Sequence, residues 1–205
     1  MEQQLRAQLS KYQGYLKQDP NNISLQIQIA DLHLRLAEFD LAREILVAII
    51  TNDPGNFEAR YMLTNVEIAS SNFQQAKDEL ESLISDGLDI PAVRYNLAYA
   101  NAFLGDYSAA KDHLLLIKDN QEVAKTKFLL GQMHHHLAEI DEGIECMSQF
   151  VLEHPEDSEA PGFLSMLYLD SENMDEARKW AHVALEKNPN QTEALVTAGN
   201  VSLAD

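Results

Sequence analysis

Four of the six prolines in this chain of 205 residues stand on a regular lattice. Pro20 and Pro54 are 34 residues apart, and so are Pro155 and Pro189. The 101 residues from Pro54 to Pro155 correspond to three further steps of this length, one of them a residue short. A fixed period of this size is typical of proteins built from stacked structural repeats, so the sequence predicts a repeat array.

A second marker recurs with the same period. It consists of a short small or polar pair, a large apolar residue, and a small residue three positions further on. Its copies start at Ala37, Ser71, Gly105, Ala138 and Glu172, at spacings of 34, 34, 33 and 34 residues. The marker predicts a tight turn that leads into a helix.

Apolar residues on both sides of each marker follow the spacing of an amphipathic helix. In the first copy, Leu25, Ile29, Leu32 and Leu36 precede the turn, and Leu41, Ile45, Leu46 and Ile49 follow it. Each unit is therefore predicted to be a helix, a turn and a second helix. A proline cannot continue the helix that it follows, so the lattice prolines are expected to separate the units.

The eighth and twentieth residues of each unit are small, which lets two helices approach closely. The eighth residues are Ala30, Thr64, Ala98, Gly131, Ser165 and Gly199, and the twentieth are Ala42, Ala76, Ala110, Gly143 and Ala177.

This combination resembles the tetratricopeptide repeat family, whose 34-residue units carry small residues at these two places and a proline at the end. The resemblance covers about 170 of the 205 residues. It implies an all-α fold, a right-handed superhelical solenoid of antiparallel helix-turn-helix units. The sequence lacks the family's early Trp, and the usual Tyr survives only as Tyr168; the other units have His33, Glu67, Asn101 and His134 there.

The markers give the expected boundaries. Repeats are predicted at 23–56, 57–90, 91–123, 124–157 and 158–191. Residues 1–22 are expected to form an N-terminal capping helix, equivalent to the second half of a unit, and 192–205 the first helix of a sixth, incomplete repeat. The apolar residues of that last segment, Leu195, Ala198, Val201 and Leu203, span more than one face, whereas a solenoid end should be polar outside. The chain is therefore expected to be a fragment of a longer protein; in the alternative, its last helix packs on another molecule.

Charge and cysteine content exclude several classes of protein. The chain has 33 acidic and 15 basic residues, a net charge of −18 that repels nucleic acids and anionic lipid surfaces. No apolar stretch is long enough for a membrane-spanning helix. The single Cys146 cannot form an internal disulfide, and residues 1–20 lack a secretory signal. These features favour a cytoplasmic protein.

The consecutive histidines, the single cysteine and the single tryptophan are predicted to be structural residues rather than parts of a metal or catalytic site. His134, His135 and His136 are consecutive, so they diverge around a helix and do not form a metal site. His134 takes the position of the family's buried Tyr and is interpreted as structural, while His135 and His136 could form a pH-sensitive contact. Cys146 and Trp180 are interpreted as packing residues.

Motifs for catalysis or ion binding are weak or absent. Residues 170–176 resemble a calcium loop only faintly, because Met174 stands where an oxygen ligand is needed. The sequence contains no phosphate-binding glycine loop, nucleophile elbow or HExxH motif. We expect no catalytic residues, no metal site, no cofactor and no enzymatic activity.

The family resemblance places residues two, five, nine, twelve and thirteen of each unit on a concave face. It gives a candidate peptide-binding groove of Tyr61, Asn65, Tyr95, Tyr99, Phe103, Phe128, Gln132, His135, His136 and Met166, with Asn96 at a position that often binds peptide backbone. Aromatic residues on such a face suit partner binding because they bring large contact area at little entropic cost. Tyr95 and Tyr99 lie on a different side of their helix from the expected core residues Leu97, Ala100 and Leu104, which favours a binding groove. The alternative interpretation is that these aromatic residues pack between helices.

The fifth positions also bear on the kind of partner. Family members that clamp a terminal carboxylate have Lys there, whereas this chain has Ile27, Tyr61, Tyr95, Phe128, Gly162 and Val196. Carboxylate clamping is therefore contradicted. The rim acids Glu58, Glu159, Asp170 and Glu193 favour a basic, amphipathic partner segment.

The sequence predicts a non-enzymatic scaffold or adaptor that binds a protein or peptide, with neither nucleic acid nor membrane as partner. Two alternatives stay open: a self-assembly module that joins through its solenoid ends as a homo-oligomer, and the regulatory arm of a larger protein.

Overall fold

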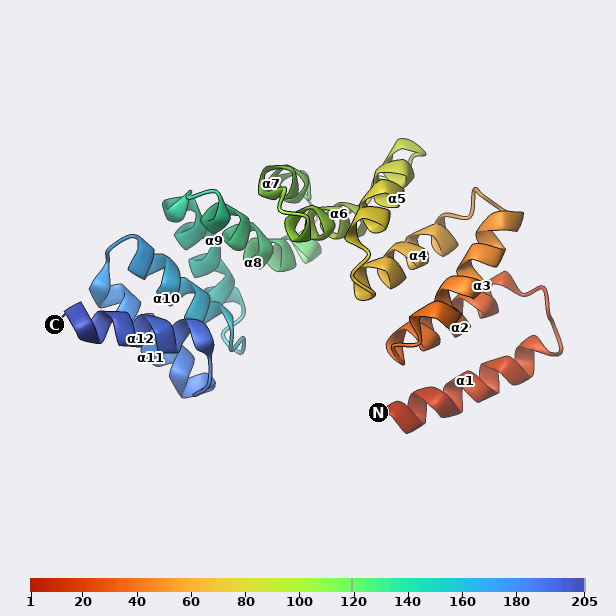
Figure 1. Ribbon diagram of the computed structural model, residues 1–205, viewed down its shortest axis with the longest axis horizontal. Helices are drawn as coiled ribbons and strands as arrows, with labels where there is room; N and C mark the ends of the chain where they lie inside the picture. Colours follow the sequence, from red (N-terminus) through yellow and green to blue (C-terminus); the bar gives the residue numbers. More distant parts are fainter. Residues whose placement is uncertain (119, 205) are drawn as a thin grey trace. The chain divides into compact units, whose positions relative to one another are not determined.

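The computed structural model describes residues 1–118 and 120–204, and of the side chains all but those of 119–125 and 203–205; the described residues form twelve helices and no strand (Figure 1). The helices are α1 (Glu2–Leu16), α2 (Ile23–Arg35), α3 (Phe39–Asn52), α4 (Phe57–Ala69), α5 (Phe73–Ser85), α6 (Pro91–Phe103), α7 (Tyr107–Leu115), α8 (Asn120–His136), α9 (Ile140–Glu153), α10 (Ala160–Asp170), α11 (Met174–Lys187) and α12 (Thr192–Ala204). The predicted all-α helical repeat is confirmed, while the exact repeat boundaries stay predictions.

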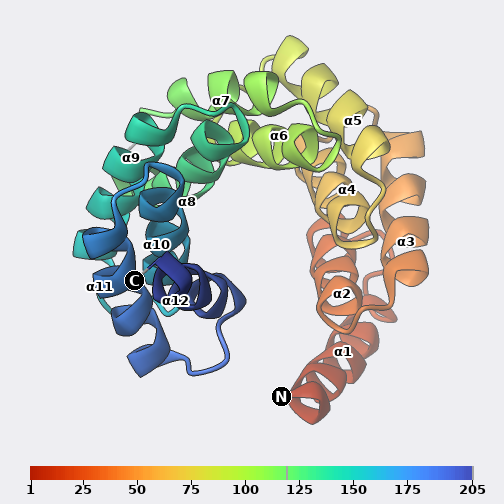
Figure 2. The same cartoon turned by 60° about the vertical axis from the view of Figure 1, so that its left-hand side comes forward.

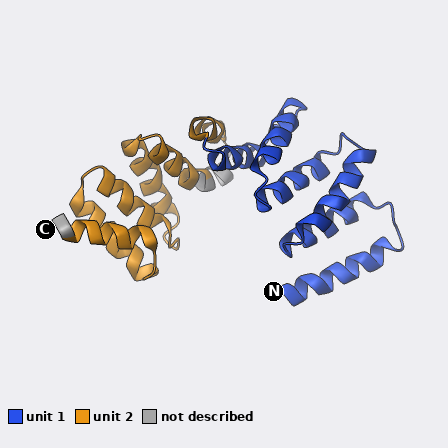
Figure 3. Cartoon of the chain, viewed as in Figure 1, with its two compact units in different colours: residues 1–105 blue, residues 106–205 orange. Residues whose placement is uncertain are grey.

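The chain divides into two compact units, residues 1–105 and 106–205 (Figure 3). In the first unit, successive helices pack on one another, and α4 also contacts α2 and α6. This leaves α2, α4 and α6 in one layer and α3 and α5 in another (Figure 2). In the second unit, α10 packs against α9, α11 and α12 in the same manner.

The lattice prolines separate helices as predicted, since all four lie in turns. In two of these turns an asparagine follows the proline by two residues and caps the next helix. Asn22 Oδ1 accepts a hydrogen bond of 3.0 Å from the Leu25 amide, and Asn56 Oδ1 accepts one of 3.0 Å from the Ala59 amide. Such caps satisfy amides that have no partner within the helix, which fixes where α2 and α4 begin.

The small residues lie where helices approach most closely. Ala30, Thr64, Ala98, Ser165, Ala42, Ala76, Ala110 and Ala177 are all completely buried. A Cβ placed on Gly143 would lie 3.4 Å from the carbonyl oxygen of Gly131 and 3.3 Å from Leu167 Cδ2. The backbones of α8 and α9 therefore approach closely, and a side chain larger than a single Cβ at either glycine would have to displace its neighbours. Gly199 on α12 differs, because a Cβ there would meet nothing within 4 Å.

One expected core residue is exposed. Leu104 is the C-cap of α6 and is 42% exposed, whereas Leu97 and Ala100 are completely buried. The helix ends before its apolar stripe completes another turn, so placing Leu104 in the core was wrong.

All five markers form tight turns, and each begins with a residue in the left-handed conformation. The φ angles are 57° at Ala37, 63° at Ser71, 84° at Gly105, 59° at Ala138 and 61° at Glu172. At the markers that start at Ala37, Ser71, Ala138 and Glu172, the amide that follows bonds back into the first helix, as when Glu139 N donates to His134 O over 2.8 Å. This arrangement satisfies carbonyl groups at the helix end and reverses the chain.

Glycine at one of these turns should stabilise the protein, because a Cβ in the left-handed conformation costs about 1–2 kcal/mol and the greater flexibility of unfolded glycine offsets only part of it. We expect Ala138→Gly to raise the free energy of unfolding by about 0.5–1 kcal/mol in urea titrations. The matched change Ala48→Gly, at an exposed site within α3, should lower it by about 1 kcal/mol. A loss of stability in Ala138→Gly would contradict the turn geometry.

In three repeats the polar residue that replaces the family's tyrosine at the end of the first helix binds the turn that follows, whereas Asn101 in the third repeat donates to the backbone oxygen of Leu97. His33 Nδ1 lies 2.7 Å from Glu38 Oε2, and His134 Nδ1 lies 2.6 Å from Glu139 Oε2. In the second repeat, Asn72 Nδ2 donates to Glu67 Oε2 over 2.7 Å. The structural interpretation of His134 is thereby confirmed.

A basic residue on the preceding helix of the other layer completes each of these contacts. Arg6 binds Glu38 over 3.0 Å, Arg43 binds Glu67 over 2.7 Å, and Lys111 binds Glu139 over 2.6 Å. Hydrogen bonds from Lys111 and His134 lower the pKa of Glu139. For convenience we call this series of contacts the turn ladder. It joins the turns at Glu38, Glu67 and Glu139 to the helix that came before each of them.

Candidate functional site

Two polar side chains and a tyrosine connect α4 to α6 in the first unit. Asn96 Nδ2 donates to Asn65 Oδ1 over 2.7 Å and to the hydroxyl oxygen of Tyr61 over 3.3 Å. All three residues are half-buried. The structure therefore brings these predicted groove residues together, with the amide donor of Asn96 engaged by its neighbours.

An aromatic cluster lies next along α6. The ring of Tyr99 is 4.7 Å from that of Phe103, and Phe103 stacks on Phe73 of α5 at 4.4 Å. Phe103 is 58% exposed, although its neighbours are half-buried. Such a cluster presents rigid apolar area whose geometry is already fixed by stacking.

Phe73 is a member of this cluster that the sequence did not predict. It is the large apolar residue of the second marker and was assigned only to the turn. Its position at the start of α5 brings it against the last turn of α6, which follows from the antiparallel packing of the two helices. The signal was the marker itself, because its large apolar residue recurs at the start of each second helix.

The tyrosines of this surface also contribute to packing. Tyr61 lies against the core cluster that contains Leu80 and Leu97, and Tyr95 and Tyr99 are half-buried. The structure thus shows side chains that belong partly to the core and partly to the surface.

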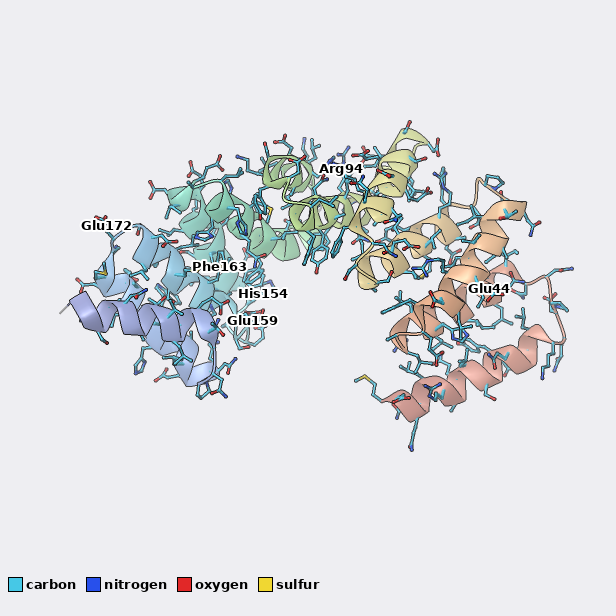
Figure 4. The ribbon with its side chains drawn as sticks, viewed as in Figure 1. Glu44, Arg94, His154, Glu159, Phe163 and Glu172 are labelled. Carbon is cyan, nitrogen blue, oxygen red and sulfur yellow. The ribbon has the colours of Figure 1, made fainter. Side chains whose placement is uncertain are left out.

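In the second unit, Phe128 of α8 and Phe163 of α10 form a separate aromatic surface. Their ring centroids are 6.2 Å apart with the planes inclined by 49°, and Phe128 also lies 5.4 Å from Phe150. Beside them is a cavity of about 290 Å³ that reaches the turn between α11 and α12. Glu159 and Phe163, labelled in Figure 4, flank the start of α10 at this cavity.

Of the predicted groove residues, Phe128 and Gln132 line this cavity. Met166 is half-buried on α10. The sequence did not single out Phe163 or Gln191, which also line it. Phe163 is the sixth residue of its repeat and Gln191 the last, so neither falls on the concave positions that the family resemblance gives.

The two remaining predicted residues point to different neighbours. His135 Nε2 is 2.8 Å from Asp170 Oδ2, and its ring meets Phe163 edge-on at 5.6 Å. His136 is exposed and stacks flat on Tyr107 of α7 at 4.1 Å. Partial burial, together with the charge of His135, lowers the pKa of His136, which favours a neutral ring in the stack.

The other singled-out residues are packing groups. Burial raises the pKa of the Cys146 thiol, and the nearby Glu145 acts in the same direction, so the reactive thiolate is disfavoured. Trp180 packs against the core of the second unit and donates to Glu176 Oε2 over 3.1 Å. The packing interpretation of Trp180 is confirmed, while that of Cys146 stays a prediction.

Two further observations concern ions and membranes. Among the described side chains, no three of His, Cys, Asp or Glu gather closely enough to hold a metal ion. Every helix in the described parts of the chain is too short or too polar to cross a lipid bilayer.

Comparison with known proteins reveals similarity in structure. No protein-family model matches the sequence, and no curated protein sequence matches it. YrrB, a tetratricopeptide repeat protein with an unusual peptide-binding site, superposes with a TM-score of 0.75 at 18% identity, over 92% of this chain and 97% of its own. MamA gives a TM-score of 0.71 at 24% identity, over 82% of this chain and 92% of its own.

A third similar structure is the hetero-tetramer Cut9-Hcn1 of the APC/C. It matches with a TM-score of 0.81 at 18% identity, over 97% of this chain but only 40% of its own. The paired antiparallel helices, the buried small residues and these superpositions agree: the chain has the tetratricopeptide repeat fold.

Proposed function

We propose that the chain is a non-enzymatic scaffold that binds a segment of a partner protein on the exposed side of its first helices. The observation that carries the proposal is the cluster of Tyr99, Phe103 and Phe73, in which an exposed ring is held by stacking. Exposed, preorganised aromatic groups supply much of the binding energy at protein interfaces. The peptide-binding site of the similar protein YrrB supports the same function.

Charge indicates the chemistry of the partner. With a net charge of −18, the chain attracts positively charged segments over distances of several ångströms in physiological salt. The exposed aromatic rings additionally require apolar anchors. A basic amphipathic segment meets both requirements, and the half-buried free thiol of Cys146 supports a reducing, cytoplasmic setting.

The test uses peptides selected on the full chain from a random displayed library. Selected peptides should be rich in Lys and Arg, and Tyr99→Ala should weaken the best of them by about 30-fold in calorimetric titrations. Tyr15→Ala, which removes an exposed tyrosine from α1, should leave affinity unchanged. Selected peptides that bind Tyr99→Ala as tightly as the original chain would refute the proposal.

Unfolding measurements separate binding from packing. Tyr99 is half-buried whereas Leu97 is completely buried, so Leu97→Ala should lower the unfolding midpoint much more than Tyr99→Ala. If both variants lose the same stability, the tyrosine is a packing residue and the binding surface loses its main support.

A second function, self-assembly, is favoured by the exposed face of α12. Leu195 and Val196 are 50% and 55% exposed, and Gly199 beside them has open space where other repeats pack a second helix. Light scattering at increasing concentration distinguishes the two functions, because a scaffold without self-association keeps a mass of 23.1 kDa.

A further inference from the structure

We propose that the cavity in the second unit is a socket for the guanidinium group of an arginine on the partner segment. The cavity lies between α8, α10 and the start of α12, with a volume of about 290 Å³. This assignment rests on the proposed scaffold function and adds the chemistry of one partner side chain.

The first observation is a buried acceptor without a donor. Gln191 is only 6% exposed and lines the cavity. Its Nε2 donates to the backbone oxygen of Glu159 over 2.7 Å, but within the described residues its Oε1 accepts no hydrogen bond. Buried oxygens without a hydrogen-bond donor are rare in proteins, because the free energy lost when water is removed from them is not recovered by another hydrogen bond. The site therefore lacks a hydrogen-bond donor.

The backbone creates the room for this arrangement. Gly162 occupies the fifth position of its repeat, where the other complete repeats have the large residues Ile27, Tyr61, Tyr95 and Phe128. A Cβ on Gly162 would lie 2.0 Å from Gln191 Nε2 and 2.4 Å from its Oε1. The amide of Gln191 thus takes the volume of a side chain that this repeat does not have.

The second observation is uncompensated negative charge. Glu159 and Glu193 line the cavity, and across the described part of the chain neither forms an ion pair. The lining contains no Lys or Arg, and its other polar members are neutral amides and a hydroxyl. A cation is the group that pairs with the two carboxylates and can donate to Gln191 as well.

The aromatic walls favour arginine over lysine. Phe128 and Phe163 line the cavity with rings 6.2 Å apart and inclined by 49°. A guanidinium is flat, weakly hydrated and able to stack on a ring while five N–H groups donate in its plane. A lysine ammonium is more strongly hydrated and lacks the flat face, so it loses more on entering.

The experiment uses the full chain, labelled with ¹⁵N, and three short peptides with blocked ends. They carry arginine, lysine or citrulline at the centre of an alanine and glycine sequence; citrulline has the shape of arginine without its charge. Chemical shifts of the Gln191 side-chain amide report binding. The arginine peptide should bind about tenfold more tightly than either of the others, because hydrogen bonds to charged groups are the stronger ones.

Two variants locate the effect. Glu159→Gln should weaken the arginine peptide by about tenfold. Glu172→Gln removes the same charge at the other end of α10 and should change the affinity less than twofold. Glu172 is marked in Figure 4 beyond the far end of that helix.

The results separate this assignment from the scaffold proposal. Equal binding of the arginine and citrulline peptides, no binding of any peptide, or equal losses in the two variants would overturn the socket. Equal binding of the lysine peptide would overturn the assignment to guanidinium. The scaffold proposal is tested instead at Tyr99 in the first unit, so a failure of the socket is distinguishable from a failure of the scaffold function.

Discussion

Replacing Gly143 with leucine should lower the free energy of unfolding by about 3 kcal/mol or more. A single added carbon would already touch the carbonyl oxygen of Gly131 and the side chain of Leu167, at 3.4 and 3.3 Å. Three further carbons have no space unless α8 and α9 separate. That separation would also loosen the core around Met147, which is completely buried. Urea titrations followed by circular dichroism measure the loss.

The same substitution at an open glycine is the control. Gly14 lies within α1, is exposed, and has nothing within 4 Å of an added Cβ. Because leucine favours the helix more than glycine does, Gly14→Leu should raise stability by about 0.5–1 kcal/mol. A similar loss in both variants would contradict the close approach of α8 and α9.

The Arg43→Met substitution is expected to cost about 3 kcal/mol at neutral pH. Arg43 donates to both carboxylate oxygens of Glu67, over 2.7 and 3.1 Å, and Glu67 is only 9% exposed. Removing the guanidinium leaves a buried charge with Asn72 and Ser70 as its remaining polar neighbours. Thermal and urea unfolding of the two proteins measure the difference.

Acid should reduce this difference. Burial acts to raise the pKa of Glu67, but hydrogen bonds from Arg43 and Asn72 outweigh it and lower the pKa below its ordinary value. A carboxylate with a lowered pKa stabilises the fold above its unfolded pKa and ceases to do so as the pH falls through its folded pKa. In Arg43→Met, protonated Glu67 needs no cation, so the variant should approach the original chain as the pH falls from about 7 to about 4.

A matched arginine provides the comparison. Arg35 and Asp31 lie 3.7 Å apart with side chains 53% and 40% exposed. Exposed pairs of this kind contribute little, so Arg35→Met should cost less than about 0.5 kcal/mol. A pH-independent loss in Arg43→Met would show that packing of its side chain, rather than its charge, stabilises the turn.

The helices and turns could be predicted because they depend on local patterns. The apolar spacing sets each helix, the lattice prolines interrupt it, and the markers reverse the chain at Ala37 and its equivalents. The small residues at two fixed positions predicted where helices touch, as Gly131 and Gly143 do between α8 and α9. None of these predictions required knowing which residues far apart in the sequence come into contact.

The groove residues could be predicted only as a set of positions. The repeat positions that the family resemblance gives include Tyr61, Asn65 and Asn96, and these three residues are in contact. Their hydrogen bonds could not be predicted, because the bonds depend on the offset between α4 and α6. The same positions correctly gave Phe103 as an exposed residue. The apolar spacing of the helix wrongly placed Leu104 in the core, because such a spacing does not reveal where a helix ends.

The cavity in the second unit could not be predicted from repeat positions or apolar spacing. Gln191 precedes α12, outside any repeated position, and its side chain fills the volume left open by Gly162. A glycine at a usually large position was visible in the sequence. What would occupy the resulting space depends on how the turn after α11 folds back, which is a property of the tertiary structure.

The turn ladder has a consequence for how such a protein can change its length. Each contact joins a turn glutamate to a basic residue on the helix before it: Arg6 with Glu38, Arg43 with Glu67, and Lys111 with Glu139. The position of Arg43 is also basic in the second, third and fifth repeats, as Lys77, Lys111 and Arg178, but it is Ile144 in the fourth. A copy of the second repeat inserted after any of the first three would therefore still bring a cation to its Glu67, whereas a copy inserted after the fourth would leave that carboxylate buried beside isoleucine. Lengthening the array by duplication is thus open at most junctions, and only the junction after the fourth repeat would require a compensating charge.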